Sequence, residues 1–248
     1  DRGEGALLYD VDGNVFIDYV MGRGPMIFGH SPSFLLNGVA DVMKIGQIFG
    51  GQHELEFKVA ELAQQMIPCA ELVRFMSSGT EAVQLALRIA RAFTARSKVV
   101  RFDSQFHGWG ENLFYGVSPE YKIGDTISAP VPQAAGLDPG TAADIIALPI
   151  NDLDVLNRAL DENHDQVAAI ISSPFPHRPE ITPGYFEDVR RICDERGIIL
   201  IFDEVVTGFR LAPGGGQEYI NVTPDLSTFA KAMANGFPVA MVAGKSEM

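Results

Sequence analysis

The hydrophobic and polar positions of this chain alternate between short apolar runs and longer amphipathic segments. The short runs are rich in β-branched residues, as buried strands are, whereas the longer segments space their apolar residues three or four apart, as helices do. We predict strands over residues 73–76, 98–102, 144–148, 166–172 and 198–203, the last of which closes the series. We predict helices over residues 34–44, 54–66, 81–95, 152–162 and 184–196. This alternation is typical of an α/β fold.

Three further segments have patterns of their own. Residues 8–19 place apolar residues on both sides of Asp12-Gly13, a pair that favours a β-hairpin turn. We therefore assign residues 1–35 to an N-terminal segment with a hairpin and residues 36–248 to one large domain. The predicted helix over 81–95 would bury a face formed by Ala82, Leu85, Ala86, Ile89 and Phe93. Residues 116–140 are rich in proline and glycine without a period, which predicts a long irregular segment.

Charge and composition narrow the class of protein. The chain has 248 residues, is 46% hydrophobic and carries a net charge of −13, so a polyanion such as nucleic acid would be repelled. We expect a cytoplasmic enzyme with small-molecule partners, and neither a signal peptide nor an apolar run of membrane-spanning length is present in the sequence. Cys69 and Cys193 lie far apart and favour two reduced, buried thiols over a disulfide. The abrupt start and end lead us to expect a fragment of a longer protein.

The first candidate for chemistry is Ser77-Ser78-Gly79-Thr80-Glu81, at a strand-to-helix junction. The free N–H groups of a helix N-terminus favour an anion, Gly79 permits close approach, and the Ser78 and Thr80 hydroxyls add donors, so a phosphate would fit there. The same residues also match a capping box formed by Ser78 and Glu81. The motif alone leaves both interpretations open.

Two more candidates follow predicted strands. Phe106 and His107 come after the strand that ends at residue 102, where an aromatic side chain could stack on a planar ring or simply pack. Asp203 ends an apolar run, and a carboxylate there could hold a pyridinium, a metal or a magnesium nucleotide. The nucleotide interpretation needs a P-loop, and the nearest match, residues 24–31, has His30 where the phosphate-binding lysine belongs.

Lys231 lies 28 residues after Asp203 and is flanked by small or apolar residues, with no acidic neighbour. Desolvation lowers the pKa of an amine and makes it a better nucleophile. An amine that forms a Schiff base and a carboxylate that keeps a pyridine nitrogen protonated are the two groups that pyridoxal phosphate chemistry needs. The pair therefore predicts a pyridoxal phosphate site.

The ordered motifs together resemble those of class III aminotransferases, and the nearest branch is similar to glutamate-1-semialdehyde aminomutase. The motifs are Ser78-Gly79-Thr80-Glu81-Ala82, Phe106-His107-Gly108, Asp203-Glu204-Val205-Val206-Thr207-Gly208-Phe209-Arg210 and Ala230-Lys231-Ala232-Met233-Ala234-Asn235-Gly236. The resemblance implies the three-layer fold type I of aspartate aminotransferase, with a mainly parallel seven-stranded sheet. It also implies a small C-terminal domain that this chain does not contain, and a homodimer whose active site lies at the subunit interface.

The resemblance further implies roles for individual residues. Lys231 would form the Schiff base, Asp203 would pair with the pyridine nitrogen, and Val205 and Phe106 would pack on opposite faces of the ring. The remaining cofactor contacts would come from Ser78, Gly79, Thr80 and His107, the first three of these at the phosphate. We expect no metal.

Two positions depart from the pattern of the resembling enzymes. Gly22-Arg23 stands where the aminomutase has a Ser-Trp pair, and Ser173-Pro174 stands where the family usually shows Glu-Pro. A guanidinium can grip a carboxylate with two hydrogen bonds, so Arg23 is a candidate substrate clamp, although a plain surface role is an equal alternative. We predict an aminotransferase that moves an amino group between an amino acid and a keto acid or aldehyde. The alternatives are an aminomutase, racemase or decarboxylase on the same scaffold and, from other classes, a non-catalytic cofactor-fold protein or a P-loop-like ATPase.

Overall fold

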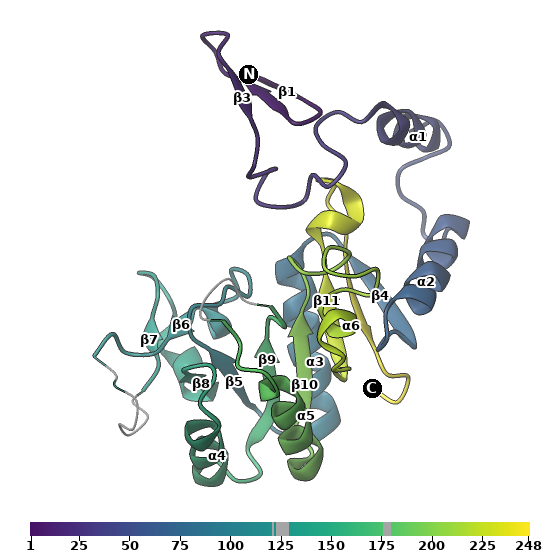
Figure 1. Cartoon of the computed structure of the whole chain (residues 1–248). Coiled ribbons are helices and arrows are strands. Elements are labelled where there is room, and N and C mark those ends of the chain that lie inside the picture. The colour runs from purple at the N-terminus through teal and green to yellow at the C-terminus, as the bar shows by residue number, and fades with distance from the viewer. Residues whose placement is uncertain (121, 123–128, 176–179) are drawn as a thin grey trace.

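A computed structural model shows a seven-stranded sheet at the centre of the chain (Figure 1) and describes residues 1–120, 122, 129–175 and 180–248. The strands of this sheet are β4 (Leu72–Met76), β5 (Lys98–Phe102), β8 (Ile145–Leu148), β9 (Val167–Ser172), β10 (Ile199–Asp203), β11 (Leu226–Phe229) and β12 (Ala240–Gly244). Their order is β4-β12-β11-β10-β9-β5-β8. Every neighbouring pair is parallel except the two that β12 makes with β11 and β4. The predicted mainly parallel sheet is confirmed.

Helices cover both faces of the sheet. The helices are α1 (Ser33–Met43), α2 (Glu54–Met66), α3 (Gly79–Thr94), α4 (Leu153–Glu162), α5 (Tyr185–Arg196) and α6 (Gly216–Ile220). Successive strand residues point to opposite faces, so Ile199 and Ile201 pack in one core cluster with α3, whereas Leu200 and Phe202 pack in another with α4 and α5. The result is the three-layer α/β arrangement that the sequence predicts.

Two details of the prediction are wrong. The strand into Asp203 does not close the series, because β11 and β12 follow it and complete the sheet. The buried face of α3 is formed by Ala82, Val83, Ala86, Leu87 and Ala90. Of the predicted face, Leu85 and Ile89 are only partly buried, and Phe93 is 50% exposed. Small alanines let the helix approach the sheet closely and turn the larger side chains outward.

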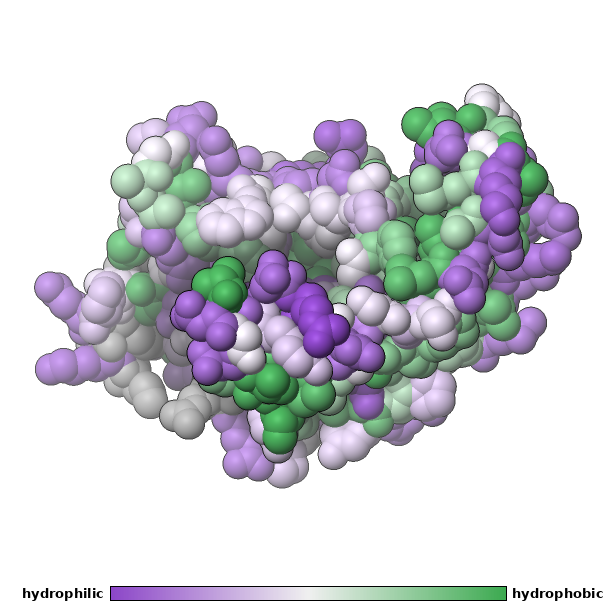
Figure 2. All heavy atoms as spheres, turned by 90° about the horizontal axis from the view of Figure 1, so that it is seen from above, coloured by the Kyte–Doolittle hydropathy of each residue, from purple (hydrophilic) through white to green (hydrophobic). Residues whose placement is uncertain are grey.

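The N-terminal segment forms a small sheet of its own, from β1 (Arg2–Glu4), β2 (Leu7–Tyr9) and β3 (Val15–Ile17), above the main body in Figure 1. The predicted hairpin is the antiparallel pair β2–β3. All three residues of β3 are exposed, and α1 has no buried residue. Figure 2 looks down on this end of the molecule and shows apolar surface in green among purple polar patches.

The remaining elements are short. They are η1 (Glu111–Leu113), β6 (Tyr115–Gly116), β7 (Val131–Pro132), η2 (Pro139–Asp144) and η3 (Lys231–Ala234). The predicted irregular segment over 116–140 contains β7, and its residues 121 and 123–128 lie outside the described residues. Cys69 and Cys193 are free and buried, as predicted. Within the described part of the chain, no helix combines the length and the apolar character needed to cross a membrane.

Candidate active site

A cavity of about 750 Å³ opens where the parallel strands of the sheet end. Its lining includes residues one or two positions after the ends of strands, namely Ser104 after β5, Ser173 after β9 and Val205 after β10. Asp203 is the last residue of β10, and Lys231 comes two residues after β11 ends. Ligands of open α/β sheets bind at this carboxyl edge of the strands. The topology therefore brings Asp203 and Lys231 into one cavity, although they are separated in the sequence.

Asp203 is held by a buried hydrogen-bond network. Its Oδ2 lies 2.7 Å from Nδ1 of His107, and its Oδ1 accepts from the Val205 N–H at 3.1 Å and from the Thr228 hydroxyl at 3.3 Å. The side chain of His107 is fully buried, and its Nε2 has no hydrogen-bond partner among the described residues. These three contacts fix the orientation of the Asp203 carboxylate.

Lys231 begins η3 with a left-handed backbone, at φ +49°, and its side chain lines the cavity. Burial lowers the pKa of its amine, the carboxylate of Asp203 opposes that shift, and the positive charges of Arg210 and Arg23 add to it. A lowered pKa leaves more of the amine unprotonated and nucleophilic near neutral pH. Lys231 thus has the local chemistry expected of a covalent attachment point.

The serine-rich motif lies at the N-terminus of α3, where the structure shows its capping interpretation. The Ser78 hydroxyl donates to a Glu81 carboxylate oxygen at 2.9 Å and accepts from the Glu81 N–H at 3.3 Å, which is a capping box. Gly79 and Thr80 line the cavity, and Ser78 is not among the residues that line it. A Cβ on Gly79 would lie 3.0 Å from a methyl group of Val205. The start of this helix therefore borders the cavity at Gly79 and Thr80.

Two apolar side chains predicted to sandwich a ring, Phe106 and Val205, both line the cavity. The Phe106 ring is 58% exposed and makes edge contacts with Trp109 and Phe114, at centroid distances of 5.6 and 6.0 Å. Gly108 has φ +87°, and a Cβ there would lie 2.6 Å from the Thr80 hydroxyl oxygen. The glycine therefore lets the loop after β5 pass close to the start of α3.

Arg23 also reaches the cavity, from the N-terminal segment. It has a left-handed backbone, at φ +64°, and Arg210 anchors the next residue by donating to the Gly24 carbonyl. The P-loop interpretation of residues 24–31 is wrong, because this stretch follows the small antiparallel sheet and its His30 pairs with Asp18 at 2.7 Å. Nothing in that geometry cradles a phosphate.

Sequence reasoning missed two residues that shape the site. Gln105 is buried, and its side chain accepts from the Ser173 N–H at 2.8 Å and donates to the Ser172 hydroxyl at 3.1 Å, joining the ends of β5 and β9. Trp109 is 73% exposed and lines the cavity. The position of Trp109 three residues after Phe106 was a usable signal, whereas a lone glutamine carries none.

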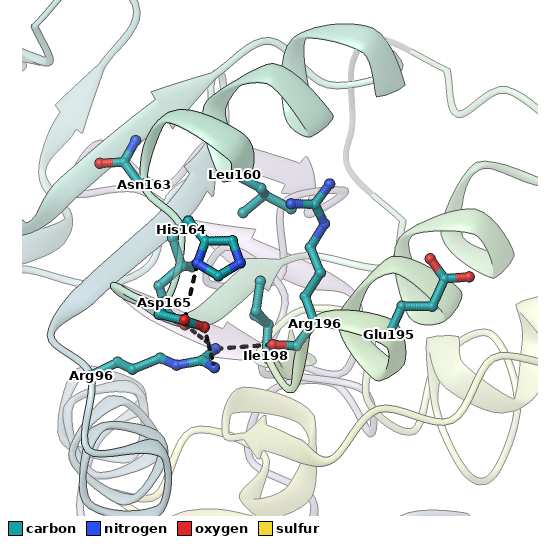
Figure 3. A pocket seen from close by; sticks show the side chains of 9 residues that line it. Arg96, Leu160, Asn163, His164, Asp165, Glu195, Arg196 and Ile198 are labelled. Atoms are coloured by element: carbon teal, nitrogen blue, oxygen red, sulfur yellow. Dashed lines mark hydrogen bonds and ion pairs between the residues drawn. The ribbon is translucent and has the colours of Figure 1, made fainter.

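A smaller pocket of about 180 Å³ lies at the opposite, amino end of the strands (Figure 3). Its most prominent cation, Arg96, already donates to the carbonyls of Val167, Arg196 and Gly197 and to the carboxylate of Asp165. Because its guanidinium is engaged by the protein, this pocket is a packing crevice and not a second candidate site.

Comparisons with known proteins identify the family of this chain. The family model described as "Aminotransferase class-III" matches residues 1–248. A glutamate-1-semialdehyde 2,1-aminomutase of Alkaliphilus oremlandii is 41% identical over 247 residues, which cover 98% of this chain and 57% of that relative. The chain thus spans a little over half the length of the curated relatives it matches.

Solved structures give the same result. An omega-transaminase from Sphaerobacter thermophilus superposes with a TM-score of 0.93 at 33% identity, covering 100% of this chain and 57% of that one. The internal aldimine form of the Sphingopyxis sp. MTA144 FumI protein with pyridoxal phosphate has a TM-score of 0.87 at 25% identity, with coverages of 100% and 57%. Fold type I is therefore confirmed. The chain belongs to the class III aminotransferases, a family of pyridoxal phosphate enzymes.

Proposed function

We propose that the protein containing this chain catalyses pyridoxal phosphate-dependent amino-group transfer, with Lys231 as the residue that holds the cofactor covalently. The observation that carries the proposal is the convergence of Lys231, Asp203 and its buried partner His107 on one cavity. Bound pyridoxal phosphate supplies an electron sink next to the transferred amino group. Retention of both the amine and the carboxylate argues against a non-catalytic protein of the same fold.

The residues present fit this cofactor. The N–H groups at Gly79 and Thr80 suit a phosphate, Val205 and Phe106 offer two apolar walls for a ring, and Asp203 supplies a fixed negative charge for a pyridinium. Because Asp203 is only 6% exposed, water screens its charge little. With the cofactor bound, the Lys231 amine would be placed to take a proton from the substrate carbon and to return it elsewhere.

Arg23 is our proposed substrate clamp. It lines the cavity near Lys231, so an amino acid could present its carboxylate there while its amino group reaches the cofactor. We therefore place first an aminotransferase acting between an amino acid and a keto acid or aldehyde. The curated relatives favour the alternative of an aminomutase over an aminotransferase, because those of that name are 38 to 41% identical to this chain. Racemase and decarboxylase chemistry would need the same residues.

Borohydride reduction of the full-length, cofactor-loaded protein, followed by peptide mapping, tests the attachment point. We expect the label on Lys231, because it is the lysine that lines the cavity in the described part of the chain. Label on Lys245, or on no lysine, would contradict the proposal that Lys231 holds the cofactor.

Substrate charge tests the clamp. Arg23→Ala should lower kcat/KM for amino acids about ten- to a hundredfold, the value of a charge-assisted hydrogen bond, and leave amines without an acid group nearly unchanged. The wild-type enzyme also separates the two candidate reactions, since an aminotransferase passes the amino group to an added keto acid and an aminomutase returns it to the same carbon skeleton. Equal losses on acids and amines would make Arg23 a structural residue.

We further propose that the enzyme works in the cytoplasm as a homodimer with its site at the subunit interface. The exposed apolar side chains around α1, including Leu36, Val42, Met43, Ile45 and Ile48, support a partner surface. Sedimentation of the full-length protein measures the assembly.

A further inference from the structure

The loop that carries Arg23 is closed on itself. We define the Arg23 loop as residues 18–30. At its base, Asp18 Oδ2 lies 2.7 Å from His30 Nε2, while Asp18 Oδ1 accepts from the N–H groups of Val20 at 2.9 Å and Met21 at 2.8 Å. Asp18 therefore fixes the start of the loop as far as Met21, two residues before Arg23.

Asn235 joins this closed loop to the body of the protein. Its side-chain oxygen accepts from the Phe28 N–H at 2.9 Å, and its side-chain nitrogen donates to the Gly29 carbonyl at 3.2 Å. Asn235 is buried and directly ends η3, the short helix that Lys231 begins. One amide thus connects the segment bearing the candidate clamp to the segment bearing the candidate catalytic amine.

The backbone of Asn235 does not by itself require asparagine. Its φ of +47° is left-handed, a conformation in which glycine and asparagine are both favoured. The next residue, Gly236, has φ +99°, and a Cβ there would lie 3.0 Å from the Met26 sulfur, so the Arg23 loop packs closely on this turn. What asparagine adds at position 235 is the pair of side-chain hydrogen bonds to the backbone of Phe28 and Gly29.

We propose that Asn235 is a positioning residue that holds the Arg23 loop in register with Lys231. It acts through the loop backbone and touches no reacting atom. The consequence for substrate preference rests on the proposed role of Arg23, whereas the consequence for the loop does not.

The substitution Asn235→Gly tests the side-chain amide alone, because it removes the amide while glycine still favours the left-handed backbone conformation. A matched control is Asn151→Gly: Asn151 also has a left-handed φ, of +67°, and its amide also bridges distant backbone, accepting from Thr182 N–H at 3.0 Å and donating to the Glu180 carbonyl at 2.7 Å. Both variants lose the same kind of bridge, in different places.

The first measurement is tryptic cleavage of the Arg23–Gly24 bond in the folded full-length protein, followed by mass spectrometry. We expect Asn235→Gly to be cut about ten times faster than wild type, since local opening governs cleavage, and Asn151→Gly to be cut at the wild-type rate. Equal rates in all three proteins, or equal acceleration in both variants, would overturn the proposal. Should Asn235→Gly fail to fold, Asn235→Asp loses only the donor to Gly29 and should shift cleavage the same way.

The second measurement is the ratio of kcat/KM for an amino acid to that for an amine lacking the acid group. Asn235→Gly should lower this ratio mainly through KM, in the direction of Arg23→Ala. If Arg23→Ala lowers the ratio and Asn235→Gly does not, the positioning role is overturned. If neither lowers it while cleavage still accelerates, the loop assignment stands and the clamp proposal fails.

Discussion

The hydrogen bond between His107 and Asp203 spans 96 positions of the chain and joins two fully or almost fully buried side chains. A buried carboxylate needs hydrogen-bond partners in place of the lost water, and here a ring nitrogen, a backbone N–H and a hydroxyl supply them. The Asp203 carboxylate is thus held in one orientation at the cavity by three contacts.

Replacing that charge gives a first prediction at the scale of the residue. Asp203→Asn should retain part of the cofactor but slow proton removal from the substrate by roughly 3 kcal/mol, about a hundredfold, because a neutral pyridine is a poorer electron sink. Stopped-flow spectra of the half-reaction with an amino donor measure this step. Thr228→Val removes one hydrogen bond and keeps the charge, so it should change the rate far less. An unchanged rate in Asp203→Asn would contradict the pyridinium role.

The amine of Lys231 supports a second prediction, on pH. Burial lowers its pKa, and Arg23 contributes a further lowering as a nearby positive charge. Removing that charge in Arg23→Ala must raise the Lys231 pKa, so the midpoint for labelling by an amine-reactive reagent in cofactor-free protein should move to higher pH. Arg88→Ala, on the exposed side of α3, is the control and should leave the midpoint in place. An unchanged midpoint, or one that moves equally in both variants, would show that the Arg23 charge does not act on the amine.

At the scale of the element, neighbouring residues at the start of α3 have different roles: one caps the helix and the next packs against the cavity wall. Ser78 is occupied by the capping box, and Gly79 forms the close approach to Val205. Ser78→Ala should therefore cost about 1 kcal/mol of unfolding free energy, the usual value of an N-cap, with little change in cofactor affinity. Chemical denaturation and cofactor titration separate the two effects, and a large loss of affinity would instead assign the Ser78 hydroxyl to the phosphate.

Gly79→Ala should show the opposite profile. The backbone there accepts alanine, but the new Cβ would press on Val205 at 3.0 Å and displace a cavity wall. We expect cofactor affinity to fall about tenfold while the unfolding free energy stays within about 1 kcal/mol of the wild-type value. The same two measurements apply, and a protein that loses stability without losing affinity would contradict this division.

The sequence predicts an element well where the buried residues of that element are apolar by type. Apolar runs such as 198–203 predict strands directly, and the spacing of Asp203 and Lys231 predicts the cofactor site. β11 was missed because half of it, Ser227 and Thr228, is polar by type yet fully buried. The Asn235 bridge was missed for a different reason: its partners lie more than 200 positions away, and no local pattern encodes such a contact.

At the scale of the whole molecule, Asp225 binds three parts of the fold together. Its buried carboxylate accepts from Arg190 of α5 at 2.7 Å, from the Leu200 N–H of β10 at 2.8 Å and from Lys245 after β12 at 2.5 Å. Burial alone would raise the Asp225 pKa, but these donors together with the charge of Arg190 hold it below its ordinary value. Its contribution to stability is therefore present above the ordinary pKa of an aspartate and is lost as pH falls through the lower, folded-state pKa.

Asp225→Ala should accordingly lower the unfolding free energy at neutral pH by about 3 kcal/mol, since removal of one partner leaves buried donors unpaired. Because the mutant lacks the titrating group, its stability should also fall less steeply than that of the wild type between about pH 5 and pH 2. Denaturant unfolding across this range measures both quantities. A mutant whose acid dependence parallels the wild type would show that other carboxylates govern acid unfolding.

The place of β12 in the sheet has a consequence for how the chain is made. β4 is an edge strand whose one neighbour in the described sheet is β12, so a segment translated early must wait for residues 240–244 before its backbone groups are paired. During synthesis at about 5 to 20 residues per second, β4 waits roughly 8 to 33 seconds for β12, whereas the side of β11 that β12 later covers waits roughly 2 seconds or less. Unpaired edges of this kind invite pairing with other chains. A ribosome-stalled chain ending near residue 239 should therefore depend on chaperones more than one in which residue 248 has left the exit tunnel.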